Sequence, residues 1–207
     1  MNVVSSTMPD LDNLKVKLII WDLDDTLWQG ILAEGDSVEL FDNRAQFIRD
    51  INGKGIVNSI CSKNNFDEGR AKLEELGLWD EFVFPKIEFS PKGPIVKWII
   101  ESMQLRPHNV VFLDDNHSNL MEVKHFSPEI TVVNATDPGV DDFLMRILEK
   151  NKDVNKSRVS QYRTLENKVK DREESDEGND EFLSSCDIKI MIASGNQNIN
   201  FIENFIL

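Results

Sequence analysis

Val16-Lys-Leu-Ile-Ile-Trp-Asp22-Leu-Asp24-Asp-Thr26-Leu-Trp28 is an apolar run that ends abruptly in carboxylates. The run has the composition of a buried strand, and its acids stand where that strand should end. Asp22 and Asp24 can lie beside one divalent cation while a carboxylate oxygen stays free to attack phosphorus, which gives an aspartyl-phosphate intermediate. In that scheme Asp24 donates and accepts the proton. An ordinary acidic turn after a strand is the alternative for this motif taken alone.

The composition limits the class of protein. The chain has 207 residues, enough for one well-packed domain plus an appendage. Its formal net charge of −14 argues against binding to nucleic acid or to an anionic membrane surface. Cys61 and Cys186 offer neither a disulfide framework nor metal-type spacing, which favours a reducing cytoplasm. The chain has no secretory signal and no apolar run near the roughly 20 residues of a membrane span, so we expect a soluble cytoplasmic protein.

Strands and helices alternate between residues 16 and 150. This alternation predicts an α/β fold with a doubly wound parallel sheet. A turn or hairpin flap is expected over Gln29–Asp36, where two glycines flank a short apolar stretch. After the first strand, further strands are predicted at Ile56–Cys61, Phe82–Phe84, Val110–Leu113 and Ile130–Val133. The predicted helices are Phe41–Ile51, Phe66–Leu76, Ser90–Leu105, a stretch that ends at Phe126, and Gly139–Lys150.

The two ends of the chain fall outside this pattern. Residues 1–15 are expected to form a loose lead-in to a catalytic domain over residues 16–150. Residues 151–207 form a tail that either packs on the core or begins a further domain. Within the tail we expect a helix over Ser157–Lys170, an acidic loop over Glu173–Asp180, a strand over Asp187–Ile192 and a helix over Ile199–Leu207.

Polar clusters follow several of the predicted strands, and one lysine stands at a helix entrance. In an open parallel sheet the carboxyl ends of neighbouring strands line one crevice. Residues far apart in the sequence would therefore meet there. The clusters are Asp22/Asp24/Thr26, Ser62/Lys63/Asn64, Lys92 and Asp114/Asp115/Asn116.

This order of motifs resembles the haloacid dehalogenase (HAD) superfamily of phosphotransferases. Four segments, Asp22–Trp28, Cys61–Asn64, Phe112–Asn116 and Ser157–Tyr162, are similar to the FkbH-like group within it. Members of that group take a glyceryl unit from 1,3-bisphosphoglycerate, remove its phosphate and load the unit on an acyl carrier protein. The resemblance implies a HAD-like Rossmannoid fold, HAD-type phosphatase or phosphotransferase activity, a phosphorylated small molecule as substrate, and an acyl carrier protein as candidate partner.

The resemblance also implies a role for each site residue. Asp22 would be the nucleophile and Asp24 the general acid and base. Mg²⁺ would be held by Asp22, the backbone carbonyl of Asp24 and the pair Asp114/Asp115, with Asp115 favoured as the direct ligand. The implied substrate-binding residues are Thr26, Ser62, Lys63, Asn64 and Lys92.

Two positions raise separate questions. Asp25 stands where the group more usually has Asn, which adds a negative charge beside the site. Cys61 is either the acceptor of a glyceryl thioester or, as the commoner fate of a free cysteine, a small buried hydrophobe.

Other functions remain open on the same residues. Predicted elements fill the intervals from Asp22 to Ser62 and from Ser62 to Lys92, so no large cap domain is expected. An open site suits a carrier protein or a phosphoprotein. The first alternative is a plain capless phosphatase acting on a phosphoester or phosphoprotein. The second is a non-catalytic binding module, which the intact set of acids and Lys92 disfavours.

Overall fold

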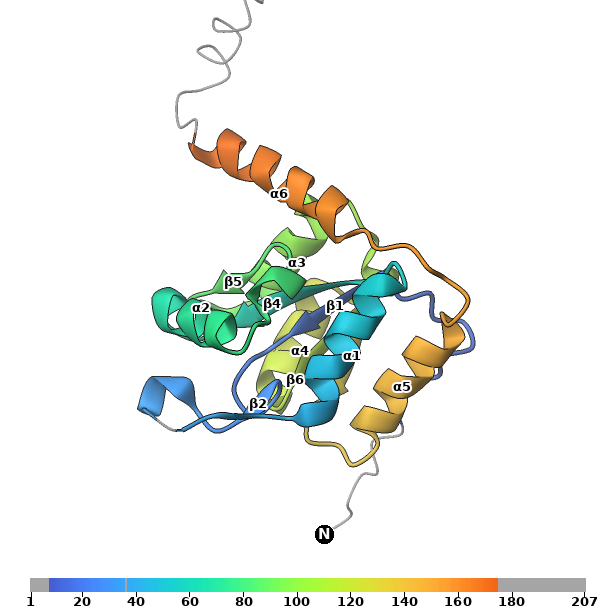
Figure 1. Ribbon diagram of the computed structural model, residues 1–207, viewed down its shortest axis with the longest axis horizontal. Helices are drawn as coiled ribbons and strands as arrows, with labels where there is room; N and C mark the ends of the chain where they lie inside the picture. The colour runs from blue at the N-terminus through green and yellow to red at the C-terminus, as the bar shows by residue number, and fades with distance from the viewer. Residues whose placement is uncertain (1–7, 36, 175–207) are drawn as a thin grey trace, which may run out of the picture. The chain divides into compact units, whose positions relative to one another are not determined.

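The computed structural model describes residues 8–35 and 37–174, which Figure 1 draws as a coloured ribbon. The chain divides into two compact units, residues 1–168 and residues 169–207. Of the second unit, only residues 169–174 are described, and they form the end of a helix. The sheet and the polar clusters that follow its strands belong to the first unit.

A five-stranded parallel sheet forms the centre of the first unit. Its strands lie in the order β5-β4-β1-β6-β7, and all four neighbouring pairs are parallel. The central strand β1 pairs with β4 on one side and β6 on the other, and every residue of these three strands is buried. Full burial explains the continuous apolar runs of β1 and β6. Strand β4 is buried as well, but it includes Asn58 and Ser59, whose side chains donate hydrogen bonds to the carbonyls of Ile48 and Phe84. The strands are β1 (Leu18–Trp21), β4 (Val57–Ser62), β5 (Lys86–Ile87), β6 (Val110–Asp114) and β7 (Thr131–Asn134).

Helices cover the two faces of this sheet (Figure 1). Because side chains alternate along a strand, Ile19 and Trp21 of β1 point to the same face. There they join one apolar core with Ile48 of α1 and Phe143 of α5. Helices α3 and α4 pack against each other. The predicted doubly wound α/β fold is confirmed. The helices are α1 (Asp42–Gly53), α2 (Phe66–Glu75), α3 (Lys92–Ser102), α4 (His117–Phe126), α5 (Val140–Lys150) and α6 (Val159–Glu174).

A small hairpin follows the central strand, as the sequence predicted. Strands β2 (Trp28–Gln29) and β3 (Glu39–Leu40) are antiparallel, and a 3₁₀ turn, η1 (Leu32–Glu34), lies between them. We call the described residues 28–35 and 37–40 the flap. Across the described ranges there is no large cap domain, which also agrees with the prediction.

One predicted strand was wrong. Phe82–Phe84 is not a strand, and the edge strand β5 comes later, at Lys86–Ile87. Phe82 forms only an isolated bridge with Asn58. The chain then leaves the extended region, because Phe84 has a φ of 52°. All three residues are buried, so their apolar character reflects burial of a loop rather than an extended backbone.

The described residues on either side of residues 16–150 contact that region. Before β1, Leu11 is buried in the core, and the Lys150 ammonium donates hydrogen bonds to the carbonyls of Asp12 and Leu14 at 3.1 and 3.2 Å. The helix predicted over Ser157–Lys170 is α6, whose Arg163 donates to the carbonyl of Asp80 at 3.1 Å.

The rest of the predicted tail, with its acidic loop beyond residue 174, its strand and its last helix, lies outside the described residues. Among the helices that the structure does describe, none combines the length and the apolar character needed to cross a membrane.

Candidate active site

The ends of three adjacent strands bring the predicted site residues together. Asp22 directly follows β1, Ser62 ends β4 and Asp114 ends β6. The parallel register aligns these ends, since Trp21 stands opposite both Ile60 and Leu113. The backbone N–H of Asp22 also donates to the carbonyl of Leu113 at 3.0 Å. The strand ends that the sequence predicted to meet therefore lie side by side.

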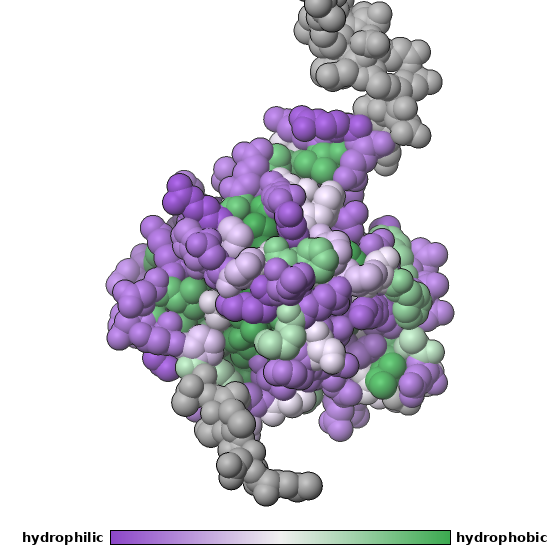
Figure 2. Space-filling model, turned by 180° about the vertical axis from the view of Figure 1, so that it is seen from behind, coloured by the Kyte–Doolittle hydropathy of each residue, from purple (hydrophilic) through white to green (hydrophobic). Residues whose placement is uncertain are grey.

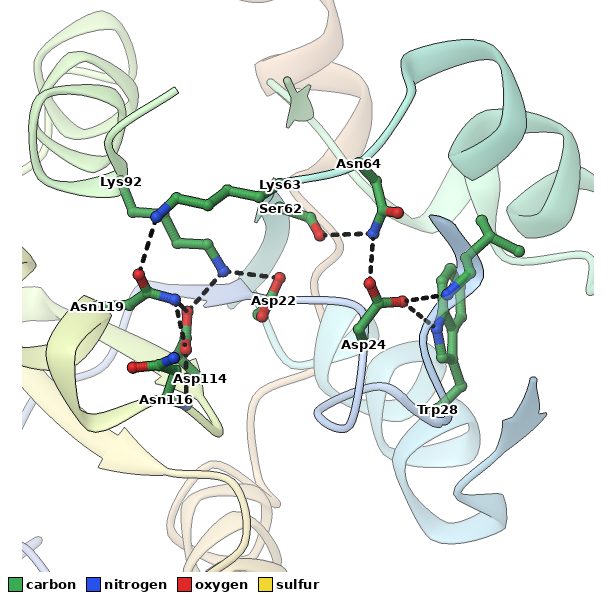
Figure 3. Close-up of polar contacts among 11 residues, drawn as sticks. Asp22, Asp24, Trp28, Ser62, Lys63, Asn64, Lys92, Asp114, Asn116 and Asn119 are labelled. Atoms are coloured by element: carbon green, nitrogen blue, oxygen red, sulfur yellow. Dashed lines mark hydrogen bonds and ion pairs between the residues drawn. The ribbon is translucent and has the colours of Figure 1, made fainter. Parts of the chain in front are cut away.

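A buried lysine joins two of these strand ends. The Lys92 Nζ atom lies 2.8 Å from Oδ1 of Asp22 and 2.6 Å from Oδ2 of Asp114 (Figure 3). Lys92 is 1% exposed, Asp22 6% and Asp114 0%. Lys92 reaches this position because α3 begins at Lys92 itself, directly after Pro91. Charges buried this deeply must be paired, and here one ammonium serves two carboxylates.

The cluster has more carboxylates than ammonium groups, and the pKa values of its side chains reflect this excess of negative charge. Burial raises the pKa of Asp22 to about 6, with Lys92 opposing that rise and the nearby Asp114 adding to it. Burial acts to lower the pKa of Lys92, but the two carboxylates outweigh it and raise that pKa above its ordinary value. Burial and Asp114 likewise raise the pKa of Asp115. The cluster would gain stability from a further cation.

Three carboxylates are placed to hold such a cation. Asp22, Asp114 and Asp115 each offer one oxygen, and these oxygens all lie within 4.8 Å of one another. A group of oxygen donors with excess negative charge fits a hard divalent cation such as Mg²⁺.

The two acids after β6 differ in their hydrogen bonding. Both oxygens of Asp114 already accept hydrogen bonds, Oδ2 from Lys92 and Oδ1 from the Asn116 N–H at 2.9 Å and the Asn119 amide at 3.0 Å. Asp115 is half-buried. This difference supports Asp115 as the direct metal ligand and Asp114 as its support.

The carboxylate of Asp24 is oriented differently from this cluster. Its Oδ1 accepts hydrogen bonds from the Trp28 indole at 2.9 Å and the Leu32 backbone N–H at 3.1 Å, and its Oδ2 accepts from Asn64 at 2.9 Å. Figure 3 shows Asp24 facing Trp28 and Asn64, whereas Asp22 faces Lys92. The two acids of the motif thus have separate hydrogen-bond partners.

The backbone explains why Asp25 can replace Asn. Asp25 has a φ of 47°, a left-handed conformation that Asn and Asp tolerate better than most residues. Its Oδ1 accepts a hydrogen bond from the Gly30 N–H at 2.9 Å. An asparagine oxygen could accept the same bond, so the substitution changes the charge and preserves the turn.

The other predicted substrate-binding residues lie at different depths. Asn64 donates to the Ser62 hydroxyl at 3.2 Å, and both residues are buried beside Asp22 and Asp24. The Thr26 hydroxyl is buried and has no hydrogen-bond partner within the described ranges. Lys63 is exposed, and its ammonium donates to Asn119 at 3.1 Å. Lys63 therefore lies at the rim of the site.

Cys61 directly precedes Ser62 in β4. The side chain is 0% exposed, and burial raises the pKa of its thiol above the ordinary value. A buried thiol of raised pKa is a poor nucleophile. These observations support the packing role over the acyl-acceptor role.

Sequence reasoning missed the roles of Asn119, Trp28 and Arg44. Asn119 lies in the first turn of α4, where its amide supports Asp114, and its position shortly after the two acids is a local signal that could have found it. The contact from Trp28 to Asp24 has no such signal, because tryptophan is expected in cores whether or not its N–H has a partner.

Arg44 is a buried charge on the inner face of α1. Its guanidinium donates to the carbonyls of Thr26 and Ala135 and pairs with Asp141 at 3.3 Å. It therefore ties the loop after β1 to the loop after β7. Its spacing of three and four residues from Phe47 and Ile48 is a signal that could have placed it on the apolar face of the helix.

No protein-family model and no curated protein matches the chain. Among solved structures, the N-terminal part of the protein BF1531 from Bacteroides fragilis, containing a phosphatase domain complexed with Mg, is 21% identical with a TM-score of 0.58. The match covers 71% of this chain and 42% of that one. The 3-deoxy-D-manno-octulosonate 8-phosphate phosphatase from Moraxella catarrhalis is 13% identical over 67% of this chain and 90% of that one, with a TM-score of 0.49. The likeness to the Bacteroides fragilis structure establishes the HAD-like Rossmannoid fold.

Proposed function

We propose that the protein is a Mg²⁺-dependent phosphoryl-transfer enzyme of the HAD type that works through an aspartyl-phosphate. The observation that carries this proposal is the buried Lys92 between Asp22 and Asp114, at the ends of two adjacent strands. A buried ion pair seldom stabilises a fold better than apolar residues of the same volume. Its presence at the strand ends, beside the buried polar residues Ser62 and Asn64, therefore supports a functional role.

The first half of the reaction breaks the donor ester. A carboxylate oxygen of Asp22 attacks the phosphorus, and the bond from phosphorus to the leaving oxygen breaks. The leaving oxygen keeps the electron pair and takes a proton from Asp24. Lys92 and the Ser62 hydroxyl stabilise the negative charge that the phosphoryl oxygens carry during this step.

The second half regenerates the enzyme. Water attacks the phosphorus of the aspartyl-phosphate and gives a proton to Asp24. The bond between phosphorus and Asp22 breaks, its electrons return to the carboxylate, and inorganic phosphate leaves. Asp24 ends with the proton that it gave away, so the cycle balances.

The metal belongs beside these residues. Asp22, Asp115 and the backbone carbonyl of Asp24 would hold Mg²⁺, with Asp114 as support. When bound, the ion would neutralise the excess carboxylate charge and polarise the phosphoryl oxygens. The chemistry of this donor set supports Mg²⁺ over metals that prefer nitrogen or sulfur ligands.

The test is phosphate release from p-nitrophenyl phosphate with Mg²⁺ and with EDTA. We expect turnover that needs Mg²⁺ and that is lost in Asp22→Asn. Arg70→Gln is a matched control, because it removes a charge from an exposed pair on α2. Turnover that survives Asp22→Asn would contradict the proposal, and the absence of any turnover would favour the binding-module alternative.

The finer proposal is the FkbH-like reaction. In it, the enzyme removes phosphate from the glyceryl donor 1,3-bisphosphoglycerate, and the glyceryl unit is loaded on an acyl carrier protein. Two features support it, the four motif segments quoted above and the lack of a cap over the site in the described ranges. A plain phosphatase on the same residues is the second candidate, favoured by the likeness in fold to a phosphatase domain.

Intact-protein mass spectrometry separates these two reactions. The carrier protein is incubated with this protein, Mg²⁺ and 1,3-bisphosphoglycerate. A gain of one glyceryl unit on the carrier that is absent with Asp22→Asn supports the transferase. Phosphate release without a carrier adduct supports the phosphatase. A glyceryl adduct on this protein itself that disappears in Cys61→Ala would restore the thioester role despite the burial of that thiol.

A further inference from the structure

Three N–H groups surround the carboxylate of Asp24. Two come from the flap, the Trp28 indole at 2.9 Å and the Leu32 backbone at 3.1 Å, and both donate to Oδ1. The third is the Asn64 amide, just beyond β4, which donates to Oδ2 at 2.9 Å. Figure 3 shows Trp28 on the side of Asp24 away from Lys92, and Asn64 bridging Asp24 and Ser62. We call the three donors the Asp24 clamp.

We infer that Trp28 and Asn64 are positioning residues that hold Asp24 so that its Oδ2 atom faces the leaving oxygen of the donor. This inference rests on the proposed phosphoryl transfer. A carboxylate oxygen has two lone pairs in its plane. On Oδ1 both are taken, by Trp28 and Leu32, whereas the described residues supply one donor to Oδ2. Proton transfer therefore falls to Oδ2.

The amide of Asn64 connects this oxygen to the phosphate end of the site. Its nitrogen donates both to Oδ2 of Asp24 and to the hydroxyl of Ser62, at 2.9 and 3.2 Å. Only the nitrogen end of the amide can face an ionised carboxylate, since the oxygen end would repel it. Asn64 is 1% exposed, so its amide has little room to move. It sets the separation between the proton-carrying oxygen and the serine that contacts the phosphoryl group.

Trp28 provides the rigid side of the clamp. Its side chain is 0% exposed, and the large ring fixes the indole N–H in one direction. Oδ1 of Asp24, which accepts from the Trp28 indole, also accepts a hydrogen bond from the backbone N–H of Leu32, the first residue of η1. A change at Trp28 should therefore misplace Asp24 while leaving Asp22 and Lys92 where they are.

The test uses two esters that differ in their need for a proton. A p-nitrophenolate leaves without protonation, whereas the alkoxide of glycerol 3-phosphate needs a proton from a general acid. The parameter is kcat/KM, because it reports on steps through the departure of the leaving group and excludes later hydrolysis. Trp28→Phe removes the indole N–H and keeps an aromatic ring.

We expect Trp28→Phe to lower kcat/KM for glycerol 3-phosphate about 10-fold more than for p-nitrophenyl phosphate. This loss is part of the rate acceleration that general acid catalysis provides. Trp21→Phe is the matched control. Trp21 is also 0% exposed, and its indole donates at 2.9 Å to Asn58 rather than to Asp24. It should lower stability by a similar amount and leave the ratio of the two esters unchanged.

Asn64→Ala gives a second measurement that does not depend on the folding of the tryptophan variant. If Asn64 positions Asp24, the alkyl ester again suffers more; if it only contacts phosphate, both esters lose equally. Equal losses in both variants would overturn the clamp while leaving the proposed function intact. If the native protein turned over neither ester in a way that depends on Asp22, the proposed function would be overturned, and the clamp with it.

Discussion

The metal-free protein should lose stability as the pH rises through the pKa of Asp22. Burial raises that pKa to about 6 from 3.8, so the folded state binds a proton that the unfolded state has already released. For a raised carboxyl pKa, the stabilising contribution is complete below about pH 4 and is lost as the pH rises through about 6. A shift of about two units corresponds to about 3 kcal/mol of unfolding free energy.

The assay is urea unfolding from pH 4 to pH 8 in EDTA, with the native protein compared with Asp22→Asn. Other groups titrate in both proteins, so the difference between the two curves isolates Asp22. Asn cannot ionise, and the native curve should therefore fall relative to the variant curve by about 3 kcal/mol over this range. Bound Mg²⁺ keeps the carboxylate ionised, so saturating Mg²⁺ should remove most of the fall in the native protein.

Parallel curves in EDTA would refute this reasoning. They would mean that Asp22 has the same pKa in the folded and unfolded states, and that Lys92 fully compensates its burial. If the native protein lost the same amount of stability relative to Asp22→Asn with and without Mg²⁺, the expected effect of Mg²⁺ would be refuted. The cation would then not be bound beside Asp22.

Two further pairs of substitutions test the site. Lys92→Met leaves two buried carboxylates unpaired and should lower the unfolding free energy at pH 7 by about 3 to 5 kcal/mol in EDTA. Lys97→Met, at an exposed position on the same helix, should cost at most about 1 kcal/mol, and equal losses would show that burial of the charge is irrelevant. Asp25→Asn keeps an acceptor for the Gly30 N–H and should stay within about 0.5 kcal/mol of the native protein. Asp25→Ala loses that hydrogen bond and strains the left-handed turn, so it should lower the unfolding free energy more than Asp25→Asn does. A smaller loss for Asp25→Ala in urea unfolding would argue that the turn does not determine the residue at this position.

The sheet and the strand-end acids could be predicted because their signals are local. Buried parallel strands favour continuous apolar runs, and β1 and β6 supply them, whereas β4 has apolar residues at Val57, Ile60 and Cys61. Once the sheet was parallel, its topology alone required Asp22, Ser62 and Asp114 to meet. The edge strand was misplaced because an apolar run reports burial, and the left-handed Phe84 that ends the extended backbone has no such sequence signal.

The parts of the site that escaped prediction depend on side-chain direction. The sequence placed Asp24 beside Asp22, but it could not show that the Asp24 carboxylate faces Trp28 and Asn64 while Asp22 faces Lys92. Nor could it show which oxygen of Asp24 keeps a free lone pair. Such facts follow from the path of the flap and from rotamers that packing selects, which spacing along the chain does not encode.

The most direct test of the aspartyl-phosphate is to trap it. In Asp24→Asn, attack by Asp22 on p-nitrophenyl phosphate needs no proton, but hydrolysis of the intermediate lacks its base. With Mg²⁺ present, intact-mass and peptide analysis after an acid quench should find one phosphoryl group on the peptide that contains Asp22, removable by hydroxylamine. A phosphoryl group on another residue, or none in a variant that still releases p-nitrophenol, would contradict the account.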